Sequence, residues 1–314
     1  EMKSNGFIKI AATLCACILL GVNAAASEKR TARAATVPAD NPYNSLFVPT
    51  YTTKIGEEYF IVDGYHNQII FSSSLDTPLS QWKVMTNETD KGHSLASDGT
   101  YYLADDTERH RVLVFKRDGE GFARTQVFEN IGNRPHMIVY NQADASFYAW
   151  SSMTDEMYVF AEQNGEIALI RKMSAPSVTG VYIRSFAILD GYIYLVSGLN
   201  NGVIIKATMD TLTPVEQYKV PDVLAGMVHM MYADGWYYLT VSTSATGDTS
   251  YANIVRTKDL GKLADYEFEE INYFFTDEGT PYYMSAFDGH YYLVKNNVWQ
   301  FDLSDGEIVD VKMK

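Results

Sequence analysis

The sequence predicts an all-β protein, a six-bladed β-propeller with four antiparallel strands in each blade. An aromatic strand motif recurs six times, with its second residues separated by 42, 46, 46, 44 and 54 positions. An Asp-Gly pair precedes most copies, as in tight turns between antiparallel strands. No long segment shows the helical period of about 3.6 residues. Repeats of this kind are typical of propeller blades. The second residues of the motifs are Phe60, Tyr102, Tyr148, Tyr194, Tyr238 and Tyr292.

The N-terminal segment predicts export. Residues 1–26 combine a basic start at Lys3 and Lys9, an apolar run over 10–22, and three alanines before Ser27. The apolar run is shorter than the roughly 20 residues that a membrane-spanning helix needs. We therefore expect a cleaved signal peptide, a secreted or cell-envelope location, and no stable membrane span after cleavage. Polar residues and prolines predict a linker over 27–44.

Residues 45–314 are expected to form the propeller. In the second repeat a polar turn follows the aromatic strand, and then come a third strand over 112–115, the turn Asp118-Gly119 and a fourth strand over 125–128. The other repeats follow a similar order, and only 259–264 suggests a helical turn. The blades are expected near 45–90, 91–132, 133–177, 178–222, 223–275 and 276–314.

Charge and cysteine content exclude several functions. The 314 residues include 25 basic and 39 acidic ones, and the formal net charge of −14 disfavours nucleic acid and anionic membranes as partners. Cys15 and Cys17 both lie in the signal peptide, so thiol catalysis, zinc ribbons and disulfides are excluded for the rest of the chain. Nucleophile-elbow, phosphate-loop and His-Glu-x-x-His motifs do not occur.

The second and third repeats resemble a known family. The relevant segments are 92–99 (GHSLASDG), 102–106 (YLADD), 109–115 (RHRVLVF) and 134–141 (RPHMIVYN). With these segments the chain resembles six-bladed propellers of the NHL-repeat type, and it is similar to uncharacterised exported propellers of bacteria. The resemblance implies the propeller fold. Propellers of this architecture range from enzymes to binding modules, so the resemblance assigns no function.

Counting along the repeats places one residue of each blade in the central channel. The first strand of each propeller blade lines the channel, and the residue five positions before its turn occupies an equivalent place in every blade. Because side chains alternate along a strand, these residues should all have the same orientation to the channel. The six positions hold Thr50, His93, His136, Ser185, His229 and Tyr283.

The three channel histidines allow two interpretations. One is a hydrogen-bonded polar layer in a water-filled channel. The other is a zinc site, since neutral imidazoles are common zinc ligands. Such a zinc site is similar to that of the peptidylglycine amidating lyases. The resemblance implies His93, His136 and His229 as zinc ligands, Arg184 as a carboxylate-binding residue and Tyr283 as the general base. No acidic residue occupies the register position, so a calcium site has no visible ligands. Zinc therefore stays a possible cofactor.

The channel mouth supplies the candidate ligand-binding residues. Arg134 and Arg184 stand out in an acidic chain, and two arginines near one mouth favour an anionic group such as a carboxylate or an acidic sugar. Trp150 and Tyr182 are also expected at or beside the mouth, whereas the Asp105-Asp106 pair is expected to be solvated. The candidate ligand-binding residues are Arg134, His136, Arg184, Tyr282, Tyr283 and His93.

Three functional hypotheses follow. The favoured one is an exported, monomeric, non-catalytic propeller that binds a glycan, a peptide or a small anionic metabolite at the channel mouth. The second is a metal-dependent lyase or hydrolase that uses the channel histidines. The third is a protein-interaction module of the cell envelope, with the insertion at 242–253 as its contact surface.

Overall fold

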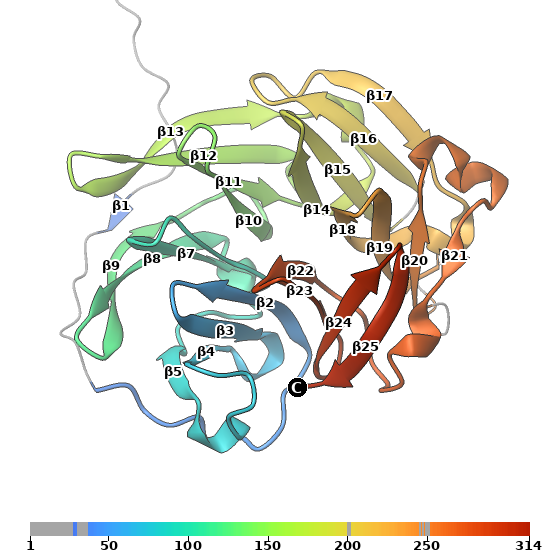
Figure 1. The fold of residues 1–314 in the computed structure, drawn as a ribbon. Coiled ribbons are helices and arrows are strands. Elements are labelled where there is room, and N and C mark those ends of the chain that lie inside the picture. The colour runs from blue at the N-terminus through green and yellow to red at the C-terminus, as the bar shows by residue number, and fades with distance from the viewer. Residues whose placement is uncertain (1–27, 30–36, 200–201, 245, 247, 249–251) are drawn as a thin grey trace, which may run out of the picture.

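The computed structural model is an all-β six-bladed propeller, and it confirms the predicted fold class (Figure 1). It describes residues 28–29, 37–199, 202–244, 246, 248 and 252–314. The predicted signal peptide and both cysteines lie outside this part of the chain. Within the described residues, no helix is long and apolar enough to cross a membrane.

Each blade is a sheet of four antiparallel strands in chain order. Blades 1 and 2 contain β2 (Pro49–Ile55), β3 (Glu58–Asp63), β4 (Gln68–Ser72), β5 (Lys83–Thr86), β6 (Leu95–Ser97), β7 (Tyr101–Asp106), β8 (Arg111–Asp118) and β9 (Gly121–Phe128). Blades 3 and 4 contain β10 (Pro135–Asn141), β11 (Ser146–Ser151), β12 (Glu156–Gln163), β13 (Glu166–Ser174), β14 (Tyr182–Leu189), β15 (Tyr192–Leu199), β16 (Val203–Thr208) and β17 (Pro214–Lys219). Blades 5 and 6 contain β18 (Gly226–Ala233), β19 (Trp236–Thr243), β20 (Asn253–Thr257), β21 (Glu269–Glu270), β22 (Met284–Phe287), β23 (His290–Val294), β24 (Val298–Ser304) and β25 (Glu307–Met313).

Short 3-10 helices complete the described structure. The longest of them, η7 (Leu260–Asp265), corresponds to the helical turn expected over 259–264. The side chain of Asp259 accepts a hydrogen bond from the backbone of Gly261 and so caps its start. The others are η1 (Gly64–His66), η2 (Leu79–Gln81), η3 (Thr107–Arg109), η4 (Pro176–Val178), η5 (Asp222–Leu224) and η8 (Asn272–Phe274).

The Asp-Gly pairs form the tight turns that the sequence predicts. Asp190 and Gly191, which join β14 to β15, have φ angles of 51° and 75°. Two successive positive φ angles match the right-handed twist of a hairpin, and aspartate and glycine adopt them at little cost. This turn chemistry recurs at Asp234 and Gly235, so the same hairpin is built in different blades.

The aromatic strands are buried on both faces and join neighbouring blades. On β7, Tyr102 packs near Phe60 of blade 1, with ring centroids 5.8 Å apart. The adjacent residues Tyr101 and Leu103 belong to a second buried cluster, which contains Phe147 of blade 3. Because successive side chains of a strand point to opposite faces, one motif provides the packing on both sides of its blade.

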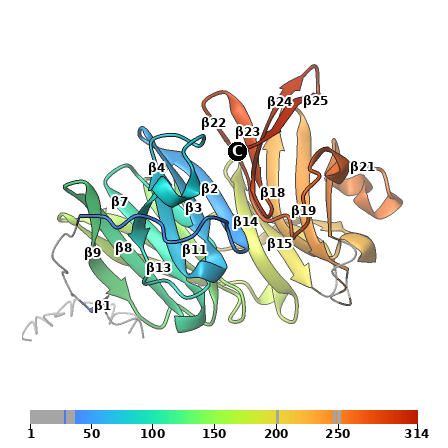
Figure 2. The same ribbon diagram turned by 90° about the horizontal axis from the view of Figure 1, so that it is seen from below.

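The ring closes between blades 6 and 1 through side chains, because every blade is made of consecutive strands. Near the channel, the rings of Tyr51 and Tyr283 stack with centroids 4.0 Å apart. Farther out, Asp288 accepts hydrogen bonds from Tyr59 (2.7 Å) and Lys54 (2.9 Å). The C-terminal Lys314 donates a hydrogen bond to Asp76 of blade 1 at 2.8 Å. Figure 2 shows β22, β23, β24 and β25 together in the last blade.

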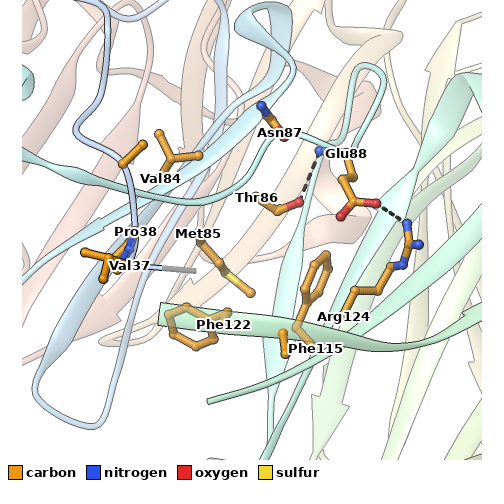
Figure 3. A pocket seen from close by; sticks show the side chains of 12 residues that line it. Val37, Pro38, Val84, Met85, Thr86, Asn87, Glu88, Phe115, Phe122 and Arg124 are labelled. Atoms are coloured by element: carbon orange, nitrogen blue, oxygen red, sulfur yellow. Dashed lines mark hydrogen bonds and ion pairs between the residues drawn. The ribbon is translucent and has the colours of Figure 1, made fainter. Parts of the chain in front are cut away.

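The segment expected to be a linker contacts the outer strands of two blades. Asn41 and Val84 donate backbone hydrogen bonds that join this segment to β5, and β1 (Glu28–Lys29) pairs with β9. Between β5 and β9 lies a groove of about 350 Å³ (Figure 3). Its walls include Met85 and Phe122.

The contacts of the linker segment with β5 and β9 cover backbone groups at the edges of these two sheets, which would otherwise be free to pair with another chain.

We expect Tyr292→Ala to destabilise the fold, because Tyr292 is 2% exposed in the cluster between blades 6 and 1 that includes Ile61 and Trp82. Removing a buried aromatic ring should lower the free energy of unfolding by about 3–5 kcal/mol, as measured by urea unfolding. The control is Tyr266→Ala, at a position 61% exposed, which should change it by less than about 0.5 kcal/mol. A loss below about 1 kcal/mol for Tyr292→Ala would contradict closure by this cluster.

Candidate functional site

The structure brings the six register residues together around one small cavity. Its volume is about 20 Å³, which is room for about one water molecule. The centre of the propeller is therefore nearly filled by side chains, and the channel is closed to anything larger than water. The residues around the cavity are Thr50, His93, His136, Met137, Ser185, Val228, His229, Tyr282 and Tyr283.

Irregular pairing at the start of the inner strands sets the direction of these side chains. The register between the first and second strands shifts around Thr50 in blade 1, His136 in blade 3 and Arg184 in blade 4. Each shift leaves one residue of the inner strand without a partner, as in a β-bulge, and bulges redirect side chains next to binding sites. The count from the turns does not reveal these bulges, because they lie beyond the regular part of the strand.

A fully buried carboxylate, Asp105, holds the start of the inner strand in blade 2. It accepts hydrogen bonds from the backbone of His93 (2.9 Å), from the backbone and hydroxyl of Ser94 (2.7 and 2.5 Å) and from the hydroxyl of Thr107 (2.7 Å). The expectation that Asp105 and Asp106 are solvated is wrong, since both are 0% exposed. The local polar sequence suggested a surface position, whereas the end of β7 is buried and supplies the carboxylate that accepts these hydrogen bonds.

The same network decides which nitrogen of His93 carries the proton. The Nδ1 atom of His93 lies 2.9 Å from the Thr107 hydroxyl oxygen, which also lies near a carboxylate oxygen of Asp105 and the carbonyl of Pro135. Thr107 has one hydrogen and faces two oxygens that can only accept, so Nδ1 of His93 must donate to it.

The imidazoles of His93 and His136 are stacked, with ring centroids 3.7 Å apart and an angle of 26° between the planes. Burial lowers the pKa of His136 well below its usual value, and repulsion from His93, Arg184 and Arg134 lowers it further. His136 is therefore neutral near pH 7. The two stacked rings close the channel on this side.

His229 lies across the channel in a more apolar environment. Its ring packs against Tyr283, with centroids 4.2 Å apart, and Tyr283 in turn stacks on Tyr51. Burial lowers the pKa of His229 to about 3, and a hydrogen bond with the backbone of Met284 opposes the shift. Its Nδ1 atom is buried and has no hydrogen-bond partner.

The three-histidine zinc site suggested by the sequence is not formed in this geometry. His93 and His136 lie face to face, and Nδ1 of His93 is bonded to Thr107. His229 packs on Tyr283 instead of turning toward them. Among the described residues, no three His, Cys, Asp or Glu side chains are grouped so that they could hold a metal ion. Equivalent register brought the histidines to one channel but did not make their nitrogens converge.

Arg134 lies at the mouth and is neutralised by a carboxylate. Its guanidinium donates to Glu108 at 2.6 Å. Partial burial tends to raise the pKa of Glu108, but Arg134 lowers it overall, so the pair is charged. The backbone of Arg134 is left-handed, with φ of 63°, as are Lys91 (49°) and Val48 (48°). Each of the three stands two residues before a channel residue, and such strained conformations cluster at functional sites.

Arg184 has no acidic partner among the described residues. Its guanidinium donates to the hydroxyl of Ser242 and lies over the ring of Tyr182, 5.9 Å from the centroid. The stem of Arg184 lies against Gly198, where a Cβ atom would come within 2.3 Å of its Cγ. A glycine on the neighbouring strand is therefore needed for this position of the arginine.

Tyrosines complete the mouth around the two arginines. Burial raises the pKa of Tyr282, while the positive charges of Arg184 and Arg134 oppose the shift. Tyr182 interacts with Arg134 through its hydroxyl, and its ring lies 6.5 Å from that of His136. The mouth thus combines two guanidinium groups with the aromatic faces and hydroxyls of two tyrosines above the stacked imidazoles of His93 and His136.

Several expectations from the sequence need correction or addition. Trp150 does not lie at the mouth: it is fully buried, and its indole nitrogen donates to the carbonyl of Ile183 at 3.0 Å. The insertion at 242–253 lies partly outside the described residues. Sequence reasoning missed Thr107, Glu108 and Gly198. A repeated aspartate at the ends of β3 and β7 (Asp63 and Asp106) was the available signal for the buried polar layer.

The comparisons with known proteins support the fold. No family model matches the chain, and no curated protein matches its sequence. Among solved structures, streptogramin B lyase is similar, with 15% identity, a TM-score of 0.59, and coverage of 88% of this chain and 86% of that one.

Two further structures are similar to this chain. Hydrazine synthase of Kuenenia stuttgartiensis has 15% identity, a TM-score of 0.57, and coverage of 82% and 77% of the two chains. A chain of a nidogen–laminin complex has 14% identity, a TM-score of 0.54, and coverage of 78% of this chain and 90% of that one. The likeness shows a shared fold. At these identities it shows nothing more.

We expect His229 to make the stability depend on pH. The folded protein keeps this ring neutral down to about pH 3, whereas the unfolded chain protonates it below about pH 6.5. The unfolded state therefore binds more protons in this window. As the pH falls, the free energy of unfolding should decrease, approaching about 1.4 kcal/mol per pH unit from this residue.

Urea unfolding between about pH 7 and pH 4.5 checks this expectation. His229→Phe keeps a ring in the site but cannot be protonated, so its curve of stability against pH should be flatter than that of the wild type. The carboxylates titrate in both proteins and cancel in the comparison. Parallel curves would mean that His229 takes up its proton in the folded protein.

Proposed function

We propose that the protein is an exported propeller that binds a small anionic ligand, one with a carboxylate such as an acidic sugar or a short peptide, at the channel mouth. The observation that carries this proposal is Arg184, a half-buried guanidinium with no acidic partner among the described residues. In a chain with a formal charge of −14, a half-buried arginine without an acidic partner is a specific feature.

The charges at the mouth favour an anion of low charge. Arg134 is paired with Glu108, which also lies 3.7 Å from Lys91, so this arginine already has a counter-ion within the protein. Arg184 has no acidic partner among the described residues, so its charge is available to a ligand. A guanidinium binds a carboxylate through two parallel hydrogen bonds, which gives direction as well as affinity.

The tyrosines favour a ligand with a flat or partly apolar body. Tyr182 lies beneath the guanidinium of Arg184, and Tyr282 is partly exposed beside it. Their rings can stack on the face of a sugar or on a peptide side chain, and their hydroxyls can donate to ligand oxygens. The stacked pair of His93 and His136 closes the floor, so the ligand stays at the mouth.

The proposal concerns binding, and the similar structures add no activity to it. Streptogramin B lyase is named as an enzyme, but at 15% identity its likeness supports the fold alone. The export part of the proposal rests on the sequence of residues 1–26, with its basic start, apolar run and alanines.

We expect Arg184→Gln to weaken anion binding by about tenfold to a hundredfold, because a charge-assisted hydrogen bond contributes about 1.5–3 kcal/mol. The measurement is isothermal titration of the mature protein with galacturonate and with galactose as its neutral counterpart. Gly198→Ala should have a similar effect, since the added Cβ displaces the stem of Arg184.

The matched control is Arg117→Gln. Arg117 pairs with Glu58 on the outer part of blades 1 and 2, away from the mouth, and its loss should leave binding unchanged. A panel of carboxylate-terminated tripeptides and their amides extends the test to peptides. Equal affinity for charged and neutral counterparts, or unchanged binding in Arg184→Gln, would contradict an anion site built on Arg184.

A further inference from the structure

The opposite mouth of the channel holds a second, larger pocket. All inner strands run in the same sense around the ring, so their first residues share one mouth and their last residues share the other. At the second mouth the ends of β2, β10, β14, β18 and β22 enclose about 340 Å³, a volume within the range of small-molecule sites. The pocket begins at Met137, His229 and Tyr283, which also line the small central cavity.

The lining of this pocket carries no charge. None of its 15 residues is Asp, Glu, Lys or Arg, although such residues make up 20% of the chain. Its one titratable group of intermediate pKa is His229, and burial keeps that ring neutral. A charged ligand would find no counter-ion in this pocket, so the pocket favours a neutral ligand.

Methionines supply much of the wall. Met137, Met230, Met231 and Met284 line the pocket together with Phe186. All of these except Met231 are at most 3% exposed. Methionine side chains are flexible and polarizable, so they adapt to the shape of an apolar ligand and make favourable contacts with aromatic rings.

Two buried polar atoms in the wall have no partner. They are Nδ1 of His229, a residue 6% exposed, and the hydroxyl oxygen of Ser285. A ring nitrogen of imidazole donates or accepts one hydrogen bond, and a hydroxyl oxygen does both, so a ligand that carries one hydroxyl group can pair with either atom.

We infer that this pocket, the methionine pocket, binds a small neutral molecule with an apolar, preferably aromatic, body and one hydroxyl group. The hydroxyl of the ligand forms hydrogen bonds with Nδ1 of His229 and with the hydroxyl of Ser285, and the apolar body packs among the methionines and Phe186. The site is distinct from the anion site at the other mouth and does not depend on it.

The experiment uses 2-naphthol as the probe, with naphthalene and 2-naphthoate as matched compounds that lack the hydroxyl or add a charge. Fluorescence titration of the mature protein should show saturable binding of 2-naphthol, with naphthalene and 2-naphthoate each at least tenfold weaker. Failure of 2-naphthol to saturate, or equal affinity of naphthalene, would overturn the inference.

Variants locate the binding. Met231→Glu places a charge in the wall and should weaken 2-naphthol binding at least tenfold, while Met153→Glu, at a position 55% exposed outside the pocket, should not. Ala286→Glu repeats the test at an exposed position on the rim of the pocket, where a charged side chain should not affect folding. Unchanged binding in both pocket variants would overturn the inference.

Two further variants separate the parts of the argument. His229→Phe should preserve naphthalene binding and abolish the preference for 2-naphthol, because it removes the ring nitrogen and keeps an aromatic ring. A preference that survives would exclude His229 as the partner of the hydroxyl. Arg184→Gln should leave 2-naphthol binding unchanged. Loss of binding in Arg184→Gln would place the probe at the other mouth and overturn the inference, whatever the outcome for anions.

Discussion

Six sheets that meet around one axis have to fill the space at that axis with six side chains from equivalent positions, and the rest of this structure depends on how that is done. Here imidazoles and phenol rings stack in pairs, His93 on His136 and Tyr51 on Tyr283, and leave about 20 Å³ between them. Flat rings pack closely against one another, so side chains fill the centre of the channel. The two mouths of the channel are therefore separate.

The two mouths differ because the chain leads into and out of the inner strands differently. At the first mouth the backbone is strained or bulged at Arg134 and Arg184, and polar residues from the preceding loops converge there. At the second mouth the strands continue regularly to their turns, and the residues that line the opening are mostly apolar and carry no acidic or basic side chain other than His229. The first mouth is positively charged and the second is neutral.

Buried polar groups hold the first mouth in place. Asp105 binds two backbone amides and two hydroxyls at the start of the inner strand, and its negative charge is stabilised by these four donors. Through Thr107 the same carboxylate sets the tautomer of His93. A network in which each donor has an acceptor makes the floor rigid, so a ligand at the mouth meets a preformed surface.

The repeat, the turns and the register could all be predicted from the amino-acid sequence. Aromatic strands at regular intervals and Asp-Gly pairs depend on local geometry, and local geometry was enough to place Thr50, His93, His136, Ser185, His229 and Tyr283 around one cavity. Local patterns also misplaced Trp150 and Asp105, because burial depends on the neighbouring blade and not on the residue itself.

The chemistry of the site depends on contacts between blades, which no local pattern of residues predicts. Whether Arg184 is paired, whether Gly198 leaves room for it and whether three imidazoles converge depend on bulges and on side chains from distant strands. The pattern of a strand repeats every two residues, and a bulge breaks that repeat without a reliable mark in the sequence. Register therefore predicted which residues meet, and packing decided in which direction their atoms point.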